Sequence, residues 1–139
     1  MITLESKYKN ILVTGGAGFI GGTFIRRLFE ESSCKIFNLD KLGYASDLTS
    51  INILVDQFKG EISQKYEFLN GNLLDKKFLE NAFSYSKPDL IIHFAAESHV
   101  DRSIDNPFDF IESNFVGTFN LLEVFREYFN NIQKNIKEY

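Results

Sequence analysis

Tryptophan is absent from this sequence of 139 residues, cysteine occurs once and proline twice. The lone Cys34 excludes an intrachain disulfide and fits a reducing cytoplasm, where we expect a small buried hydrophobic side chain rather than a reactive thiol. No stretch approaches the ~18 apolar residues of a membrane span. The N-terminal segment MITLESKYKN also lacks the apolar core of a signal peptide. The sequence therefore predicts a soluble, cytoplasmic protein.

An excess of positive charge is missing too, because 15 Lys and Arg stand against 19 Asp and Glu, and the net charge is -4. A phosphate backbone attracts a basic stripe, which this chain lacks, so we expect no nucleic acid partner. Hydrophobic residues make up 44% of the chain, and 15 residues are phenylalanine. A chain of this length can bury roughly two thirds of its unfolded surface, so we expect one domain with a largely aromatic core.

The chain is organised around the segment NILVTGGAGFIGG, residues 10–22, in which an apolar run ends in a cluster of glycines. Residues with helical periodicity follow at once. This order predicts a strand over residues 11–14, a tight turn and a helix. The apolar side of that helix would carry Phe19, Ile20, Phe24, Ile25 and Leu28.

The glycines of this turn have the spacing of a dinucleotide-binding site. Gly15 would turn the chain out of the strand, Gly18 would let the backbone approach a pyrophosphate, and Gly21 would let the helix pack closely. Amide groups at the helix N-terminus would then face the anion. A glycine-rich turn without a ligand is the alternative for an isolated match of this pattern.

A second predicted strand, residues 35–39, ends in Asp40, which lies 19 residues after Gly21. A carboxylate about 20 residues beyond the glycines is placed to bind the adenosine ribose hydroxyls of NAD. A solvated acid at a strand end is the alternative for Asp40. The combined pattern predicts a binding site for NAD.

Strands and helices continue to alternate along the chain. We expect a helix over residues 51–58 with Asp47 or Thr49 as its N-cap, a strand over residues 66–70, a helix from Asp75 to Lys87, a strand over residues 89–94, a loop over residues 95–105 and a long helix from Asn106. This alternation predicts an α/β fold of the Rossmann type, a doubly wound parallel sheet with strand order 3-2-1-4 that stops after about four strands.

The last predicted helix is apolar on more than one side. Its main stripe consists of Phe108, Ile111, Phe115, Thr118, Leu122, Phe125 and Phe129, and Phe110, Val116, Leu121 and Val124 widen it. One side can lie on the sheet, while the other would suit a partner subunit or a missing segment. Since the fourth strand would also leave an open sheet edge, we expect self-association into a homo-oligomer through this helix.

Ligands of an open α/β sheet bind beyond the carboxyl ends of its strands. After the fourth predicted strand, two small alanines leave room for a flat ligand, and Ser98, His99, Asp101 and Arg102 crowd the same loop. A capped, solvated loop is the alternative, with an ion pair between Asp101 and Arg102. We expect His93, at the end of the strand, to be a hydrogen-bonded core histidine rather than a catalyst.

Three segments carry a family resemblance, TGGAGFIG, NLDKLGYASDL and HFAAESHVDRSIDNPFDFIESNFVGTFNLLE. From about residue 9 to residue 128, the chain resembles the dTDP-glucose 4,6-dehydratases of the extended short-chain dehydrogenase/reductase superfamily. TGGAGFIG fits any nucleotide-sugar epimerase or dehydratase of that superfamily, whereas the other two segments are more specific to 4,6-dehydratases. The resemblance implies an NAD-dependent lyase of nucleotide-sugar metabolism that converts dTDP-glucose to dTDP-4-dehydro-6-deoxyglucose and water.

The resemblance also implies which residues surround NAD. It places Gly15, Gly18, Phe19, Ile20 and Gly21 at the turn, Asp40, Lys41 and Leu42 at the adenosine ribose, Asn72 and Leu73 along the adenine, and Ala95, Ala96, Glu97, Ser98 and Ser113 at the nicotinamide half. Ser98 and His99 would reach the dTDP-sugar. Asn114, in Asn-x-x-Gly-Thr, would support the hydrogen-bond network of the active site, with an interhelical hydrogen bond as the alternative.

The chain departs from the family pattern in several places. Asn72 stands where aspartate is usual, which keeps a carbonyl acceptor for the adenine amine but loses a charge. Gly43 and Ser113 replace residues that are threonine in many relatives, and only Ser113 keeps the hydroxyl. Neither the Tyr-x-x-x-Lys pair that supplies the base of the family nor its Thr-Asp-Glu run occurs in this sequence.

We therefore assign no catalytic residue and expect no metal site. The 139 residues would form the NAD-binding part of the enzyme, without the C-terminal part that binds the substrate, and would be inactive alone. Another NAD-dependent nucleotide-sugar epimerase or decarboxylase is an alternative, and so is a non-catalytic dinucleotide-binding module.

Overall fold

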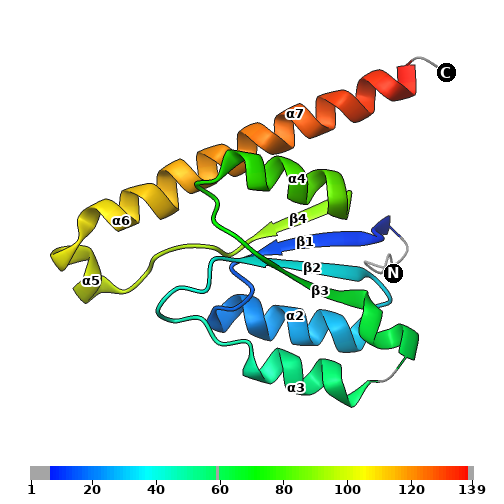
Figure 1. The fold of residues 1–139 in the computed structure, drawn as a ribbon, viewed down its shortest axis with the longest axis horizontal. Helices are drawn as coiled ribbons and strands as arrows, with labels where there is room; N and C mark the ends of the chain where they lie inside the picture. The colour runs from blue at the N-terminus through cyan, green and yellow to red at the C-terminus, as the bar shows by residue number, and fades with distance from the viewer. Residues whose placement is uncertain (1–6, 59, 138–139) are drawn as a thin grey trace. The chain divides into compact units, whose positions relative to one another are not determined.

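The structure, a computed structural model, describes residues 7–58 and 60–137, which form two compact units. The first unit contains the described residues up to Gly71 together with Ser86–Ala95, and it holds the sheet (Figure 1). The second unit contains Asn72–Tyr85 and residues 96–137, and it is helical.

The sheet has four parallel strands, β1 (Asn10–Thr14), β2 (Lys35–Asp40), β3 (Tyr66–Asn70) and β4 (Leu90–His93). Their order is β3-β2-β1-β4, which confirms the predicted order (Figure 1). Each strand begins and ends within one residue of its predicted bounds. Because all four strands run the same way, the segments that follow β1, β2 and β4 in this unit meet at one edge of the sheet.

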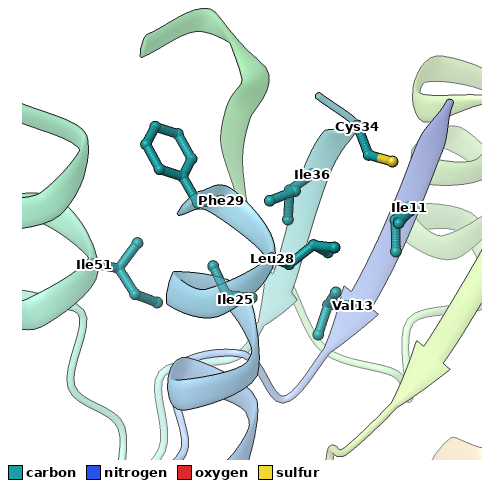
Figure 2. Close-up of a cluster of buried hydrophobic side chains, with 8 residues drawn as sticks. All are labelled: Ile11, Val13, Ile25, Leu28, Phe29, Cys34, Ile36 and Ile51. Carbon is teal, nitrogen blue, oxygen red and sulfur yellow. The ribbon is translucent and has the colours of Figure 1, made fainter. Parts of the chain in front are cut away.

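One face of the sheet is covered by α2 (Phe19–Glu31) and α3 (Thr49–Gln57) (Figure 1). Figure 2 shows the side chains that gather between these helices and β1 and β2, namely Ile11, Val13, Ile25, Leu28, Phe29, Cys34, Ile36 and Ile51. Cys34 is buried, as predicted, and its Sγ lies 3.2 Å from the Tyr8 carbonyl oxygen. A 3-10 helix, η1 (Gly60–Lys65), leads from α3 towards β3.

The predicted apolar side of α2 is wrong at its first two positions. Phe19 is 91% exposed and Ile20 is 66% exposed, whereas Ile25 and Leu28 are buried. The first turn of a helix that leaves a glycine turn at the sheet edge lies beyond the strands, so its side chains have no sheet beneath them. Phe19 and Ile20 therefore lie at the carboxyl end of the strands and are not part of the core.

Carboxylates accept hydrogen bonds near the start of two of the helices. α3 begins at Thr49 with Leu48 as its N-cap and no side-chain capping hydrogen bond, so the prediction of Asp47 or Thr49 as the N-cap is wrong. The Thr49 N–H nevertheless donates to Asp47 Oδ1, one residue before the N-cap, at 2.8 Å. These hydrogen bonds to Thr49 also lower the pKa of Asp47. The Phe78 N–H donates to Asp75 Oδ1 at 2.9 Å, which confirms Asp75 as the cap of α4 (Lys76–Ser86).

The second unit corrects two predictions. The expected loop over residues 95–105 contains a helix, α5 (Val100–Asp105), whose first turn holds an acidic residue that suits the positive end of the helix dipole. The expected long helix begins at Pro107 but consists of α6 (Pro107–Ile111), a π-helical segment η2 (Glu112–Gly117) and α7 (Thr118–Lys137). Sequence periodicity does not reveal the extra residue of a π turn.

The side chains predicted to widen the apolar surface of this helical run differ in exposure. Leu121 and Val124 are buried, whereas Val116 is 43% exposed. The exposed stripe consists of Phe108, Ile111, Phe115, Leu122, Phe125 and Phe129, each at least 41% exposed. Among the described residues, no helix is both long and apolar enough to cross a membrane.

The last register pair between β1 and β4 joins Thr14 to His93. Thr14 Oγ1 and His93 Nδ1 lie 2.5 Å apart, and the Ala95 N–H donates to the same hydroxyl oxygen at 3.5 Å. The Thr14 hydroxyl and His93 Nδ1 therefore share one hydrogen bond at the end of the β1–β4 pairing. His93 is exposed at the end of β4, so the prediction of a core histidine is wrong, although the ring is hydrogen-bonded to Thr14. Desolvation of the ring still lowers the pKa of His93 below its ordinary value of 6.5, because it disfavours the charged form.

We expect the His93 ring to titrate below pH 6.5 in the folded chain. Since the unfolded chain then binds the proton more readily, the free energy of unfolding falls as the pH drops through this region. The measurement is an NMR titration of the ring protons in His99→Gln, which leaves His93 as the only histidine. A midpoint at or above 6.5 in this variant would contradict the desolvation of the ring.

Candidate functional site

The glycine turn begins directly after β1, where Gly15 has a φ of +72°. Its N–H donates to the Leu39 carbonyl of β2 at 2.9 Å, so the turn starts while still attached to the neighbouring strand. A Cβ atom at position 15 would lie 2.4 Å from the Ala95 nitrogen. Both the left-handed backbone and the close approach of residue 95 therefore require glycine here.

Packing requires two further glycines. A Cβ at position 16 would lie 2.1 Å from Asn38 Oδ1, and one at position 21 would lie 2.2 Å from the Gly15 carbonyl oxygen. The close approach of Gly21 lets the first turns of α2 lie against the backbone of the glycine turn.

Gly18 differs from these glycines. Its backbone is extended, with φ -80° and ψ 172°, a conformation open to any residue. A Cβ there would have one close neighbour, the Gly15 carbonyl oxygen at 3.3 Å. Gly18 is the N-cap of α2. Because glycine has no side chain, nothing from this position caps the first amides of the helix. A side chain at Gly18 would thus be tight against one backbone oxygen, but far less crowded than at positions 15, 16 and 21.

Asp40 ties the end of β2 to the glycine turn. Its Oδ2 accepts a hydrogen bond from the Ala17 N–H at 3.0 Å, and its Oδ1 accepts from the Leu42 N–H at 2.8 Å and the Ser46 hydroxyl at 3.2 Å. Asp40 is only 7% exposed, so the alternative of a solvated acid is excluded. A carboxylate offers about four acceptor positions, of which three are used, so one further hydroxyl can be bound.

The loop after β2 is shaped by the same contacts. Leu42 has a φ of +56°, which is rare for a residue with a side chain and directs its N–H towards Asp40. The Asp47 N–H donates to the Ala17 carbonyl at 2.8 Å. Ala17 is thus held through both its N–H and its carbonyl, a role that the sequence analysis missed. Lys41 lies exposed in this loop.

Asn38 is a second residue that sequence reasoning missed. It is fully buried in β2, and its Nδ2 donates to the Tyr66 hydroxyl at 3.0 Å. Burial raises the pKa of that hydroxyl. Asn38 Oδ1 faces Gly16 and has no hydrogen-bond partner. The available signal was a single amide inside the otherwise apolar strand IFNL.

In the second unit, an asparagine of η2 holds the segment that follows Ala95. Asn114 Oδ1 accepts from the Glu97 N–H at 2.8 Å, and Asn114 Nδ2 donates to the Glu97 carbonyl at 2.9 Å. The side-chain amide thus pairs with both main-chain groups of Glu97, as a neighbouring β-strand would. It joins a helix to an extended segment, so the interhelical hydrogen bond considered for Asn114 does not apply. Ser113, next to Asn114, is half-buried, and Ala96, Ser98 and His99 are exposed.

The segment after β3 contains the two residues expected along the adenine. Asn72 is exposed, and its Oδ1 accepts from the Leu74 N–H at 3.1 Å. The carbonyl that the sequence analysis assigned to the adenine amine is therefore already bound within the segment. Leu73 is buried. The side chain of Arg102, expected to pair with Asp101, lies outside the described part of the chain.

The two units divide the predicted site residues between them. The first unit brings together Gly15, Gly18, Phe19, Ile20, Gly21, Asp40, Lys41, Leu42 and Ala95 at the carboxyl edge of the sheet. The second contains Asn72, Leu73, Ala96, Glu97, Ser98, His99 and Ser113. Over residues 7–58 and 60–137, no group of His, Cys, Asp and Glu side chains could hold a metal ion.

Known proteins are similar to this chain in sequence and in structure. A dTDP-glucose 4,6-dehydratase from Escherichia coli is 43% identical over 127 residues, which cover 91% of this chain and 33% of that enzyme. The crystal structure of dTDP-glucose 4,6-dehydratase from Bacillus anthracis in complex with NAD matches with a TM-score of 0.68 and 32% identity, covering 86% of this chain and 34% of that chain.

An epimerase has a similar structure as well. The UDP-Glc/GlcNAc 4-epimerase from Campylobacter jejuni matches with a TM-score of 0.73 and 30% identity, again over 86% of this chain and 34% of that chain. The chain spans about a third of the length of the curated relatives that it matches. The family described as GDP-mannose 4,6 dehydratase matches residues 12–139, which is most of the sequence. The chain therefore belongs to the GDP-mannose 4,6 dehydratase family.

Proposed function

We propose that this chain is the NAD-binding part of a dTDP-glucose 4,6-dehydratase. The observation that carries the proposal is the glycine turn, in which a Cβ would overlap other atoms at Gly15, Gly16 and Gly21 but would meet a single backbone oxygen, at 3.3 Å, at Gly18 at the N-terminus of α2. An open backbone at the positive end of a helix is suited to a pyrophosphate. The names of relatives support dTDP-glucose as the substrate of the whole enzyme, because proteins 43% and 42% identical to this chain are named dTDP-glucose 4,6-dehydratase.

The residues present fit the cofactor. The amides at the start of α2, including those of Phe19 and Ile20, would bind the pyrophosphate, and the remaining acceptor position of Asp40 would bind an adenosine ribose hydroxyl. When bound, NAD accepts and returns a hydride, the oxidation and reduction that a 4,6-dehydratase requires. Asn72 and Leu73 would lie at the base.

The nicotinamide half would be bound by the segment that starts at Ala95. Ala95 and Ala96 present little side chain, and the paired hydrogen bond from Asn114 fixes the backbone at Glu97. Ser98 and Ser113 would contribute hydroxyl groups there. Ser98 and His99, both exposed, would also reach the dTDP-sugar. This chain's own residues would thus bind and orient the cofactor, and the base of the family's Tyr-x-x-x-Lys pair is not among them.

A nucleotide-sugar 4-epimerase is the second candidate, supported by the Campylobacter jejuni structure and its TM-score of 0.73. A decarboxylase and a non-catalytic dinucleotide-binding module are further alternatives. The genomic DNA beyond the codon for Tyr139 separates them. A continuing frame with Tyr-x-x-x-Lys and Thr-Asp-Glu favours the dehydratase, and Tyr-x-x-x-Lys alone favours an epimerase. A stop codon there favours the module.

Two further parts of the proposal concern location and assembly. Cys34 is a buried free thiol, which supports a location in the reducing cytoplasm. The exposed stripe from Phe108 to Phe129 supports self-association through α7 into a homo-oligomer.

We expect Gly18→Ala to weaken NAD binding about tenfold or more while leaving the fold stable, because its methyl group enters the space proposed for the pyrophosphate. Gly21→Ala is the matched variant, and we expect it to lower the free energy of unfolding by about 1–3 kcal/mol through overpacking. Calorimetry with NAD and thermal unfolding measure the two effects. Unchanged NAD affinity in Gly18→Ala would contradict the proposed site.

We expect the chain to bind NAD more tightly than NADP, because the Asp40 carboxylate repels a 2′-phosphate on the ribose that it binds. Asp40→Asn removes that charge and should narrow the difference between the two dissociation constants. Asp47→Asn, at an exposed position just before α3, should leave that difference unchanged. Calorimetry with both dinucleotides is the measurement. A preference for NADP in the unchanged chain would overturn the role of Asp40.

We expect the purified 139-residue chain to give no turnover of dTDP-glucose in the presence of NAD, because its sequence has no Tyr-x-x-x-Lys pair. Chromatography of the sugar nucleotides after prolonged incubation is the measurement, with heat-treated protein as the control. Product above that control would mean that other residues supply the base.

A further inference from the structure

Asn120, in the first turn of α7, reaches the segment that follows β3. Its Nδ2 donates to the Leu73 carbonyl at 3.1 Å and to the Leu74 carbonyl at 3.4 Å, although these residues lie 47 and 46 positions earlier in the chain. Asn120 is half-buried, so water competes only partly for these hydrogen bonds. One side chain thus binds two consecutive carbonyls of the segment expected at the adenine.

The end of η2 is built to allow this contact. A Cβ atom at Gly117 would lie 3.0 Å from the Leu73 Cβ, a separation tighter than ordinary packing. Gly117 and Leu73 are both buried. The missing side chain at position 117 therefore brings the helix close enough for Asn120, one turn later, to reach the two carbonyls.

The segment is also held from within. Asn72 Oδ1 accepts from the Leu74 N–H at 3.1 Å, and the Asp75 N–H donates to the Asn72 carbonyl at 3.0 Å. The amide oxygen of Asn72 is the atom that accepts from the Leu74 N–H. The NH2 group of the same side chain therefore lies on the side of the amide away from that hydrogen bond. Asn72 is exposed, so its polar group lies at the surface on a segment whose backbone Asn120 holds.

We propose that Asn120 is a positioning residue for recognition of the adenine. By holding Leu73 and Leu74, it sets where the Asn72 amide and the neighbouring backbone meet the base. This inference rests on the proposed NAD site. Adenine presents an acceptor at N1 and a donor at its amine, whereas hypoxanthine presents a donor and an acceptor at the same positions. A rigid segment distinguishes the two bases, and a loose segment adapts to both.

The test is calorimetry of the full chain with NAD and with nicotinamide hypoxanthine dinucleotide. We expect the unchanged chain to prefer NAD by about tenfold, and Asn120→Leu to lose most of this preference together with about tenfold of its NAD affinity. Asn120→Gln, which keeps the amide, should regain part of both. Asn130→Leu makes the same change at an exposed position of α7 and should match the unchanged chain.

Thermal unfolding separates positioning from simple stabilisation. If Asn120→Leu melts earlier but keeps the preference for NAD, Asn120 is only structural and the inference is wrong. Equal affinity of the unchanged chain for both dinucleotides also overturns it, because no base contact would then exist to position. Absence of any NAD binding by the unchanged chain would instead refute the proposed cofactor site. Should Asn120→Leu fail to fold, Asn120→Ser provides the same comparison.

Discussion

The hydrogen bond from the Ala17 N–H to the Asp40 carboxylate is the interaction on which the sheet edge depends. It joins the turn after β1 to the end of β2 at 3.0 Å in a buried position, where a charged acceptor makes a strong bond. The same carboxylate binds the backbone of Leu42 and the hydroxyl of Ser46. A single side chain therefore fixes the turn and the following loop relative to each other.

This arrangement combines structural and proposed binding roles in one carboxylate. Three of its acceptor positions organise the protein, and the one left over is held in a defined direction by the other three. A group that is already immobilised loses little entropy when a ligand binds it. The glycine turn follows the same logic, since a side chain at Gly15, Gly16 or Gly21 would overlap other atoms, while one at Gly18 would press on a single backbone oxygen. The backbone at Gly18 is thus held by its neighbours and is the least crowded of the four.

Asparagine side chains perform the corresponding task in the second unit. Asn114 binds both main-chain groups of Glu97, and Asn120 binds the carbonyls of Leu73 and Leu74. An amide can pair with a peptide group or bridge neighbouring carbonyls, so each of these side chains attaches a non-helical segment to the helical run. The π-helical segment that contains Asn114 fits the observation that such turns often occur at functional sites.

The sequence by itself determined the alternation of strands and helices, their order in the sheet and the location of the glycine turn. These follow from local patterns, namely apolar runs, helical periodicity and glycine spacing, which act over a few residues. It predicted α2 but misplaced Phe19 and Ile20, and it missed α5 and the π turn in η2, because exposure at a sheet edge and an extra residue in a helix leave no periodic trace. Only the tertiary structure decided that Asp40 is buried against Ala17 and that Asn120 reaches Leu73. Those contacts join residues 23 and 47 positions apart, and their geometry exists only once the chain has folded.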